Sequence, residues 1–192
     1  PMMKKLLKII LVIFFLVQLD ALVAQETSYY TEKNKYLKEG LSLVDQQLYA
    51  PAQLKFGLMA KALKGVIDND RHTLVMFADY YYALCAAKLG QDNTELLFTR
   101  FIEAYHETTL RNRAYFELGS YYFRKNKMVN TVEWYEKVDT KELTNDELIE
   151  YKFNFGYAYF KRKKFDQAKP LLRSIKDAKH SYSEPANYYY GF

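Results

Sequence analysis

The feature that most constrains the fold of this chain is a repeat of 37 residues. Large aromatic, small and again aromatic residues follow one another around Tyr82, Gly119 and Gly156, and these three anchor positions are each 37 residues apart. An earlier copy starts near Gly40, and a fifth copy begins at Pro185. Repeats with periods of roughly 20 to 50 residues are typical of folds in which similar units stack along the chain. The sequence therefore predicts a stack of structural repeats.

Each copy indicates two amphipathic helices, because apolar residues recur three and four positions apart. With only 7 Gly and 4 Pro, the chain favours long helices over strands and turns. Thr144, followed three residues later by Glu147, has the spacing of a helix-capping box, whereas Pro170 is expected to bend its helix. The predicted helix pairs are 30–47 with 51–66, 71–90 with 93–106, 110–126 with 128–138, and 144–163 with 165–178.

The copies share residue types at corresponding positions. The matching residues are Tyr36, Gly40, Ala52 and Phe56 in the first copy, Ala78, Cys85, Phe98 and Phe101 in the second, Tyr115, Leu118, Gly119, Tyr122, Tyr135 and Val138 in the third, and Phe155, Gly156, Tyr159, Ala168, Leu172 and Ile175 in the fourth. With these residues the chain resembles the tetratricopeptide repeat family over roughly residues 30 to 192. Tyr82 stands where that family has a glycine.

The resemblance implies an all-α fold, a right-handed α-solenoid of antiparallel helix pairs. The implied repeats cover about 30–66, 71–107, 110–143 and 144–180, with the start of a fifth at 185. In the family, the first helix of each pair lines a concave groove that holds extended peptides or partner helices. The resemblance implies a protein or peptide partner.

Groove residues follow from the same resemblance. The third copy would contribute Arg113, Phe116, Ser120, Phe123 and Arg124, and the fourth Glu150, Phe153, Tyr157, Phe160 and Lys161. Aromatic side chains and arginine are the residue types that dominate binding hot spots. The alternative is that neighbouring repeats cover several of these side chains.

The N-terminal residues have the layout of a secretory signal peptide. Three lysines precede an unbroken apolar run at 9–17, and the small residues Ala21 and Ala24 come directly before a polar stretch. We expect a signal peptide at 1–24, cleaved after Ala24, and a repeat domain at 25–192 in an exported protein of the periplasm or the outer-membrane or cell surface. The alternative is a retained membrane anchor, but the apolar run meets Gln18 and Asp20 before it reaches the roughly 20 residues that cross a bilayer.

No sequence pattern indicates catalysis, a metal or a cofactor. The histidines His72, His106 and His180 form no closely spaced pair, and Cys85 is the only cysteine, so the chain has neither an internal disulfide nor a zinc-binding cluster in its sequence. Cys85 falls on an apolar helix face and is predicted to belong to the core. Glycine-rich phosphate loops and a nucleophile elbow are missing from the sequence. We expect a protein that is not an enzyme.

The charge of the chain argues against a nucleic-acid partner. The formal net charge is +5, and removal of 1–24 takes away three lysines and one aspartate, which leaves +3. The basic run 161–164 lies at a predicted turn, where cations suit a helix C-terminus. The alternative for this run is contact with an acidic partner or a weak contact with anionic lipid headgroups.

Together these features predict a non-catalytic scaffold of the cell envelope that binds a protein or peptide. Two alternatives are a component or accessory of an envelope hydrolase, and a membrane-tethered surface protein. Terminal repeats of a solenoid normally carry a polar cap, and the run 188–190 is three tyrosines. We therefore expect either the N-terminal part of a longer solenoid or a C-terminal helix that another molecule covers, including end-to-end self-association through that helix.

Overall fold

The computed structural model describes residues 35–65, 70–106, 108–177 and 179–192 of the 192-residue chain. The predicted signal peptide and the start of the first predicted helix lie outside these residues. All regular elements within the described ranges are helices, which confirms the predicted all-α class. None of the described helices is long and apolar enough to cross a membrane. The chain divides into two compact units, Pro1–Ala78 and Asp79–Phe192.

The first unit contains the first predicted helix pair, formed by helical residues 35–45 and by α2 (Tyr49–Ala62), together with the start of α3 (Arg71–Leu89). Its core is built on the fully buried side chains of Met59, Leu63 and Ala78. The two helices approach closely at Gly40, where an added Cβ would lie 2.7 Å from the ring of Phe56. A small residue opposite a large one is what such a close helix crossing requires.

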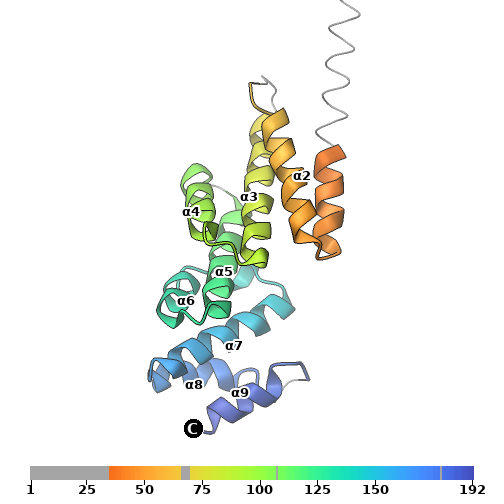
Figure 1. The fold of residues 1–192 in the computed structure, drawn as a ribbon. Coiled ribbons are helices and arrows are strands. Elements are labelled where there is room, and N and C mark those ends of the chain that lie inside the picture. Colours follow the sequence, from red (N-terminus) through yellow and green to blue (C-terminus); the bar gives the residue numbers. More distant parts are fainter. Residues whose placement is uncertain (1–34, 66–69, 107, 178) are drawn as a thin grey trace, which may run out of the picture. The chain divides into compact units, whose positions relative to one another are not determined.

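The second unit continues from Asp79 along α3 through three further helix pairs and a final helix. The bounds are α4 Thr94–Ala104, α5 Thr109–Arg124, α6 Met128–Tyr135, the short 3₁₀ helix η1 Thr140–Glu142, α7 Asn145–Lys161, α8 Phe165–Arg173 and α9 Ser183–Tyr190. From α4 to α9 each α-helix packs against the next, and α7 also packs against both α5 and α9 (Figure 1). The predicted helices are confirmed to within five residues at the ends that the structure describes.

In each of the four helix pairs, the first helix ends in the same backbone motif. One residue adopts a left-handed conformation, and the following N–H donates to a carbonyl five residues earlier, which is the Schellman arrangement. The left-handed residues are Gln47, Gly90, Asn126 and Lys163, with φ of 59°, 70°, 57° and 59°. The bonds are Leu48 to Leu43 (2.8 Å), Gln91 to Ala86 (3.0 Å), Lys127 to Tyr122 (2.9 Å) and Lys164 to Tyr159 (2.9 Å). The repeat is therefore present in the backbone as well as in the side chains.

The turns also correct one anchor of the repeat. Asn126 and Lys163 follow Gly119 and Gly156 by seven residues, and Gly90 follows Ala83, not Tyr82, by the same seven. Ala83 is fully buried, as a residue at the helix crossing must be. The second copy therefore keeps a small residue at this position, and the spacing of first helices is 36 and then 37 residues. The two equal intervals of 37 residues arose because Tyr82 was aligned with Gly119 in place of its neighbour Ala83.

Small-to-large contacts hold the later helix pairs together as well. Gly119 lies against the ring of Tyr135, and a Cβ at Gly156 would come within 2.9 Å of the side chain of Leu172. Tyr135 and Leu172 are both fully buried in one apolar cluster that extends from α5 to α9. Cys85 is also fully buried, and burial raises the pKa of its thiol to about 12, so its predicted place in the core is confirmed.

Two local signals of the sequence fall at the start of α7 and inside α8. At the start of α7, the Thr144 N–H donates to the Glu147 carboxylate over 2.8 Å and the Glu147 N–H donates to the Thr144 hydroxyl over 3.3 Å, so the predicted capping box is confirmed. Pro170 lies inside α8. Because proline lacks an N–H, α8 forgoes one helical hydrogen bond at that residue.

Candidate functional site

The structure brings the aromatic groove residues of α5 and α7 into one cluster. The ring of Phe123 lies edge-on to the rings of Phe153 and Tyr157, with centroids 6.4 Å and 5.6 Å away. Phe153 and Tyr157 are stacked at 6.1 Å. Phe160 joins them through Tyr189 of α9, whose ring is 4.8 Å from that of Tyr157 and 5.1 Å from that of Phe160. We call Phe123, Phe153, Tyr157 and Phe160 the aromatic row.

Helix α9 and the preceding turn cover part of the aromatic row. Tyr182 packs on Phe153 at 4.9 Å, and Phe153 is 9% exposed. The other three members of the row keep partial exposure. The sequence left open whether neighbours cover the groove positions, and both readings hold in part: one ring is buried, whereas Phe123, Tyr157 and Phe160 remain accessible at their edges.

Basic side chains flank the aromatic row at equivalent places in successive first helices. Arg124 and Lys161 end α5 and α7, and both are exposed. The guanidinium of Arg124 donates to the Ala87 carbonyl of α3 over 3.1 Å, while the side chain of Lys161 makes no ion pair or hydrogen bond with the described residues. Arg113 is also exposed and lies 3.5 Å from the carboxylate of Glu147. The face thus combines aromatic edges with cations that solvent or a ligand can reach.

Two predicted groove residues lie in the interior instead. Phe116 is 4% exposed and packs on the ring of Tyr135 at 6.0 Å, and Ser120 is 1% exposed. Both point into the crossing of α5 and α6, because Gly119 allows those helices to approach so closely that the neighbouring positions are enclosed as well. In this structure they support the fold.

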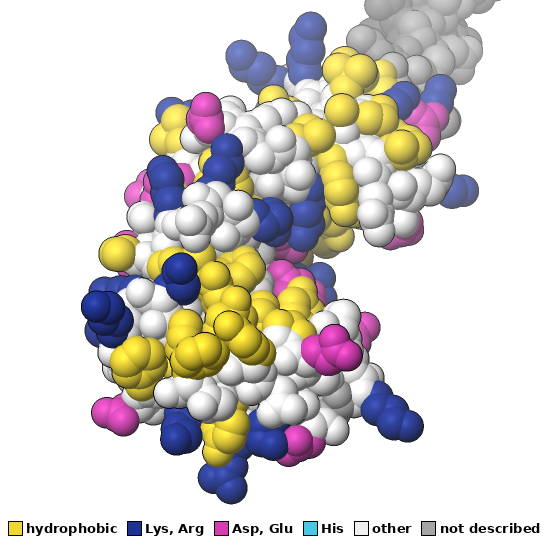
Figure 2. Space-filling model, turned by 60° about the horizontal axis from the view of Figure 1, so that its bottom comes forward, with side chains coloured by type: hydrophobic (Ala, Val, Ile, Leu, Met, Phe, Trp, Pro, Cys, Tyr) yellow, Lys and Arg dark blue, Asp and Glu magenta, His cyan; other side chains and the backbone are white. Residues whose placement is uncertain are grey.

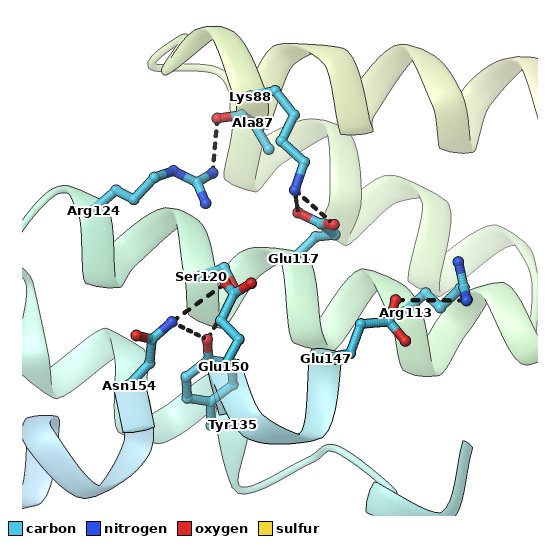
Figure 3. Close-up of polar contacts among 10 residues, drawn as sticks. All are labelled: Ala87, Lys88, Arg113, Glu117, Ser120, Arg124, Tyr135, Glu147, Glu150 and Asn154. Atoms are coloured by element: carbon cyan, nitrogen blue, oxygen red, sulfur yellow. Dashed lines mark hydrogen bonds and ion pairs between the residues drawn. The ribbon is translucent and has the colours of Figure 1, made fainter. Parts of the chain in front are cut away.

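Ser120 belongs to a chain of hydrogen bonds that sequence reasoning missed (Figure 3). The Asn154 amide donates to the Tyr135 hydroxyl over 3.1 Å, the Tyr135 and Ser120 hydroxyls are 2.8 Å apart, and the Ser120 hydroxyl donates to Glu150 over 2.9 Å. With Ser120 donating to Glu150, Tyr135 donates to Ser120, so the protons run in one direction towards the carboxylate. Burial raises the pKa of the Tyr135 hydroxyl, which therefore stays a donor. The predicted groove residue Glu150 is half-buried at the end of this chain.

A second polar contact links α3 and α5. The Lys88 ammonium donates to both carboxylate oxygens of Glu117 at 2.9 Å and 2.7 Å, and Glu117 is 9% exposed (Figure 3). A signal for these contacts exists in the sequence. Glu117, Ser120 and Asn154 are polar residues at positions that the apolar spacing assigns to the buried side of a helix, and buried polar groups need partners.

The chemistry that this face offers is recognition by apolar contact and by charge. Among the described residues, no group of three or more His, Cys, Asp and Glu side chains lies where it could hold a metal ion. Comparisons of the chain with protein-family models, with curated proteins and with solved structures found no match. Its function is therefore argued from the geometry of this face.

Proposed function

We propose that this chain is a non-catalytic helical-repeat scaffold of the tetratricopeptide type, which binds a protein or peptide through the aromatic row and the adjacent Arg124 and Lys161. The observation that carries the proposal is the repetition of one surface pair. Phe123 with Arg124 and Phe160 with Lys161 are 37 residues apart, each pair combining a partly exposed ring with an exposed cation. An extended ligand that crosses from α5 to α7 meets the same pair of residue types on both helices.

The rings of the aromatic row suit binding because they are already held in place. Phe123 contacts both Phe153 and Tyr157, so little side-chain freedom remains to be lost when a ligand covers them. Aromatic rings beside arginine are the residue types that contribute most to binding energy at interfaces. An aromatic surface whose rings are held in place, with exposed cations at its margin, is therefore well matched to an apolar peptide that carries acidic groups.

The assignment to a tetratricopeptide-type solenoid rests on three features of the helix pairs. These are the recurring left-handed turn, the contact of a small residue with a large one at each crossing, and the packing of α7 against both α5 and α9. The left-handed turn recurs at Gln47, Gly90, Asn126 and Lys163, as stacked units require.

The N-terminal sequence supports export of the scaffold to the cell envelope. Residues 1–24 contain lysines, then an apolar run, then small residues before Gln25, which is the order of regions in a cleavable signal peptide. Mass analysis of the protein isolated from its own cells tests this part. A chain that begins at Gln25 is expected, and a chain that retains residues 2–23 would mean a membrane tether instead.

Binding is tested with the mature chain as bait in an envelope extract, compared with two single variants. Arg124→Glu reverses an exposed charge and Tyr157→Ala removes one ring of the aromatic row. We expect both to reduce capture of the same partner by roughly tenfold, which corresponds to about 1.4 kcal/mol. The matched control is Lys141→Glu, because Lys141 is an exposed cation on η1, away from the aromatic row.

Each variant is first compared with the parent chain by circular dichroism, so that loss of fold is recognised. If the parent chain captures no partner, or if Lys141→Glu weakens capture as much as Arg124→Glu does, the proposed binding face is wrong.

A further inference from the structure

Three glutamates of α5 and α7 face a neighbouring first helix, and they differ in whether the chain supplies a cation (Figure 3). Glu117 accepts hydrogen bonds from Lys88 with both of its carboxylate oxygens. Glu147 lies 3.5 Å from the guanidinium of Arg113. Glu150 has no Lys, Arg or His of the described residues within 4.0 Å of its carboxylate. Glu150 is thus the member of this group whose charge the described chain leaves uncompensated.

The two oxygens of the Glu150 carboxylate differ in their partners. Oε1 accepts one hydrogen bond from the Ser120 hydroxyl over 2.9 Å and a longer one from the Asn154 amide over 3.4 Å. Both lone pairs of Oε1 are thereby used. Oε2 accepts no hydrogen bond from a described residue and keeps some contact with solvent. One oxygen therefore holds the carboxylate in place, and the other is available to a donor from outside the chain.

The surroundings of Glu150 strengthen its attraction for a cation. The residue is half-buried, and Phe153, less than one turn further along α7, is 9% exposed beneath the ring of Tyr182. Burial, followed by the negative charge of Glu150, raises the pKa of the Tyr182 hydroxyl, so the carboxylate acts on this ring. A charge among apolar rings is screened less by water than a charge on an open surface.

Glu150 lies on the side of α7 that carries the aromatic row. Phe153 follows it by three residues and Tyr157 by seven, a spacing that keeps side chains on one side of a helix. Lys161 follows Glu150 by eleven residues, which corresponds to roughly 16 Å along the helix axis. The binding surface therefore has a carboxylate at one margin and the cations Arg124 and Lys161 at the other.

Both signs of charge also border apolar surface elsewhere on this unit. Figure 2 shows hydrophobic side chains gathered over the second unit, with Lys and Arg side chains to the left of them and Asp and Glu side chains to the right. A ligand that covers apolar surface of this kind meets attraction or repulsion according to the order of its own charges. Charge order is therefore a means of selecting the ligand.

We propose that Glu150 binds the ammonium group of a lysine in the polypeptide that lies on the aromatic row. The ammonium donates to Oε2, apolar side chains of the ligand cover the aromatic row, and its acidic groups reach Arg124 and Lys161. This inference rests on the proposed function, because it assigns a ligand group to the same surface. It adds a basic side chain, on the flank opposite to the acidic groups, to the description of the partner.

An ammonium suits Oε2 better than the other donors of a polypeptide do. A neutral amide or hydroxyl would form a hydrogen bond about half as strong as a charge-assisted one. The planar fork of an arginine binds a carboxylate best through two oxygens, and Oε1 is already occupied. The compact ammonium of a lysine needs one oxygen. Bound in this way, a ligand lysine gives Glu150 the cation that Glu117 and Glu147 obtain from the chain itself.

The test begins with a display library of random peptides of about 12 residues, selected on the full mature chain. The proposed function predicts selected sequences that combine apolar and acidic residues. The assignment of Glu150 predicts, in addition, a lysine at a fixed spacing from the acidic residues, enriched several-fold over the unselected library. Selection on Glu150→Gln should retain the apolar and acidic residues and lose the lysine.

One selected peptide is then synthesised with its lysine, or with glutamine or arginine in that place. Isothermal titration calorimetry is expected to show binding weakened roughly tenfold by glutamine and several-fold by arginine. Glu150→Gln should weaken binding of the lysine peptide by the same roughly tenfold. It should not weaken binding of the glutamine peptide further, because the two changes remove one and the same contact.

Two further variants separate a direct contact from an effect on the fold. Glu150→Lys should bind a peptide with glutamate in place of the lysine more tightly than it binds the lysine peptide. Glu103→Gln is the charge-matched control, because Glu103 is an exposed carboxylate on the second helix α4, and it should leave the affinity unchanged. Circular dichroism and denaturation midpoints establish that each variant is folded.

The outcomes distinguish this inference from the proposed function on which it rests. Selected peptides without a fixed lysine would overturn the role of Glu150 but leave the aromatic row as the binding surface. A lysine whose replacement costs as much on Glu150→Gln as on the parent chain would do the same. If no peptide is selected, or if Tyr157→Ala does not weaken the selected ones, the proposed function fails and the assignment of Glu150 fails with it.

Discussion

Gly119 of α5 lies so close to the ring of Tyr135 on α6 that a methyl group at Gly119 would overlap the ring. The ring cannot easily move aside, because Tyr135 is fully buried and its hydroxyl is held by Ser120 and Asn154. The same crossing is looser in the next pair, where Gly156 faces the flexible side chain of Leu172. The two glycines therefore occupy equivalent positions, but the crossing at Gly156 should accept an added methyl group more easily than the crossing at Gly119.

We predict that Gly119→Ala destabilises the fold by roughly 1 to 3 kcal/mol, the usual cost of overpacking a core. Gly156→Ala should cost less, because Leu172 can change rotamer and alanine favours the helix by up to about 1 kcal/mol. Chemical denaturation followed by circular dichroism measures both. Gly191→Ala is the control, since a Cβ there meets nothing nearer than 3.6 Å. Equal stability of Gly119→Ala and the parent chain would contradict the assigned crossing.

Removal of the Tyr135 hydroxyl should destabilise the second unit without altering its shape. Tyr135→Phe leaves the Asn154 amide without one acceptor and deprives Ser120 of its donor, which costs about 1 to 3 kcal/mol for buried groups. Ser120→Ala should cost a similar amount. In the double variant the costs should not add, because both hydroxyls belong to one chain of hydrogen bonds. Fully additive costs would mean that the two hydroxyls act independently.

The Lys88–Glu117 pair should contribute more to stability than an exposed ion pair does. Lys88→Met leaves a Glu117 carboxylate that is 9% exposed without its cation, and we expect a loss of roughly 1 to 3 kcal/mol. The comparison is Lys125→Met, whose partner Asp92 is fully exposed and 3.5 Å away. That change should cost no more than about 0.5 kcal/mol. A larger loss for Lys125→Met would contradict the burial that the structure assigns to Glu117.

The fold should weaken in alkali because of its buried tyrosines, among them Tyr151 and Tyr159. Burial, followed by hydrogen bonding to Glu136, raises the pKa of Tyr159 to about 12, and burial raises the pKa of Tyr151 to about 12. Tyrosines of the unfolded chain ionise near pH 10, so above that pH the unfolded state holds fewer protons than the folded state. The contribution of these hydroxyls to the free energy of unfolding is therefore fully present below about pH 10 and is lost as the pH rises towards 12.

Denaturation midpoints at rising pH, together with the ultraviolet absorbance of tyrosinate, measure this decline. Tyr159→Phe should make it shallower, because one of the contributing hydroxyls is removed. A midpoint that stays constant between about pH 10 and 12 would show that these hydroxyls are not protected by the fold.

The helix pairs could be predicted because their signals are local. Apolar spacing, the capping box at Thr144 and the small residues Gly40, Gly119 and Gly156 each act within one pair, and the structure has each of them in the expected place. The anchor in the second copy could not be fixed to the residue. Tyr82 and Ala83 both suit a 36- or 37-residue spacing, and only the left-handed turn at Gly90 decides between them.

The site was harder to predict because exposure depends on residues far apart in sequence. The resemblance placed Ser120 and Tyr157 in the same groove, but Ser120 is enclosed by Tyr135 and Glu150, whereas Tyr157 keeps an exposed edge beside α9. The spacing of residues along α5 and α7 identifies which residues share one side of each helix. It does not identify which neighbour covers that side, since the cover comes from a different helix.

The central claim is that the aromatic row binds another polypeptide, and site-specific photo-crosslinking in cells tests it most directly. A photoreactive residue replaces Tyr157, or Lys141 as the control, and crosslinked products are separated and sequenced. We predict a discrete product of one partner at 157 that Arg124→Glu removes, and none at 141. The same products at both positions, or no product at 157 with a folded and exported chain, would contradict the claim.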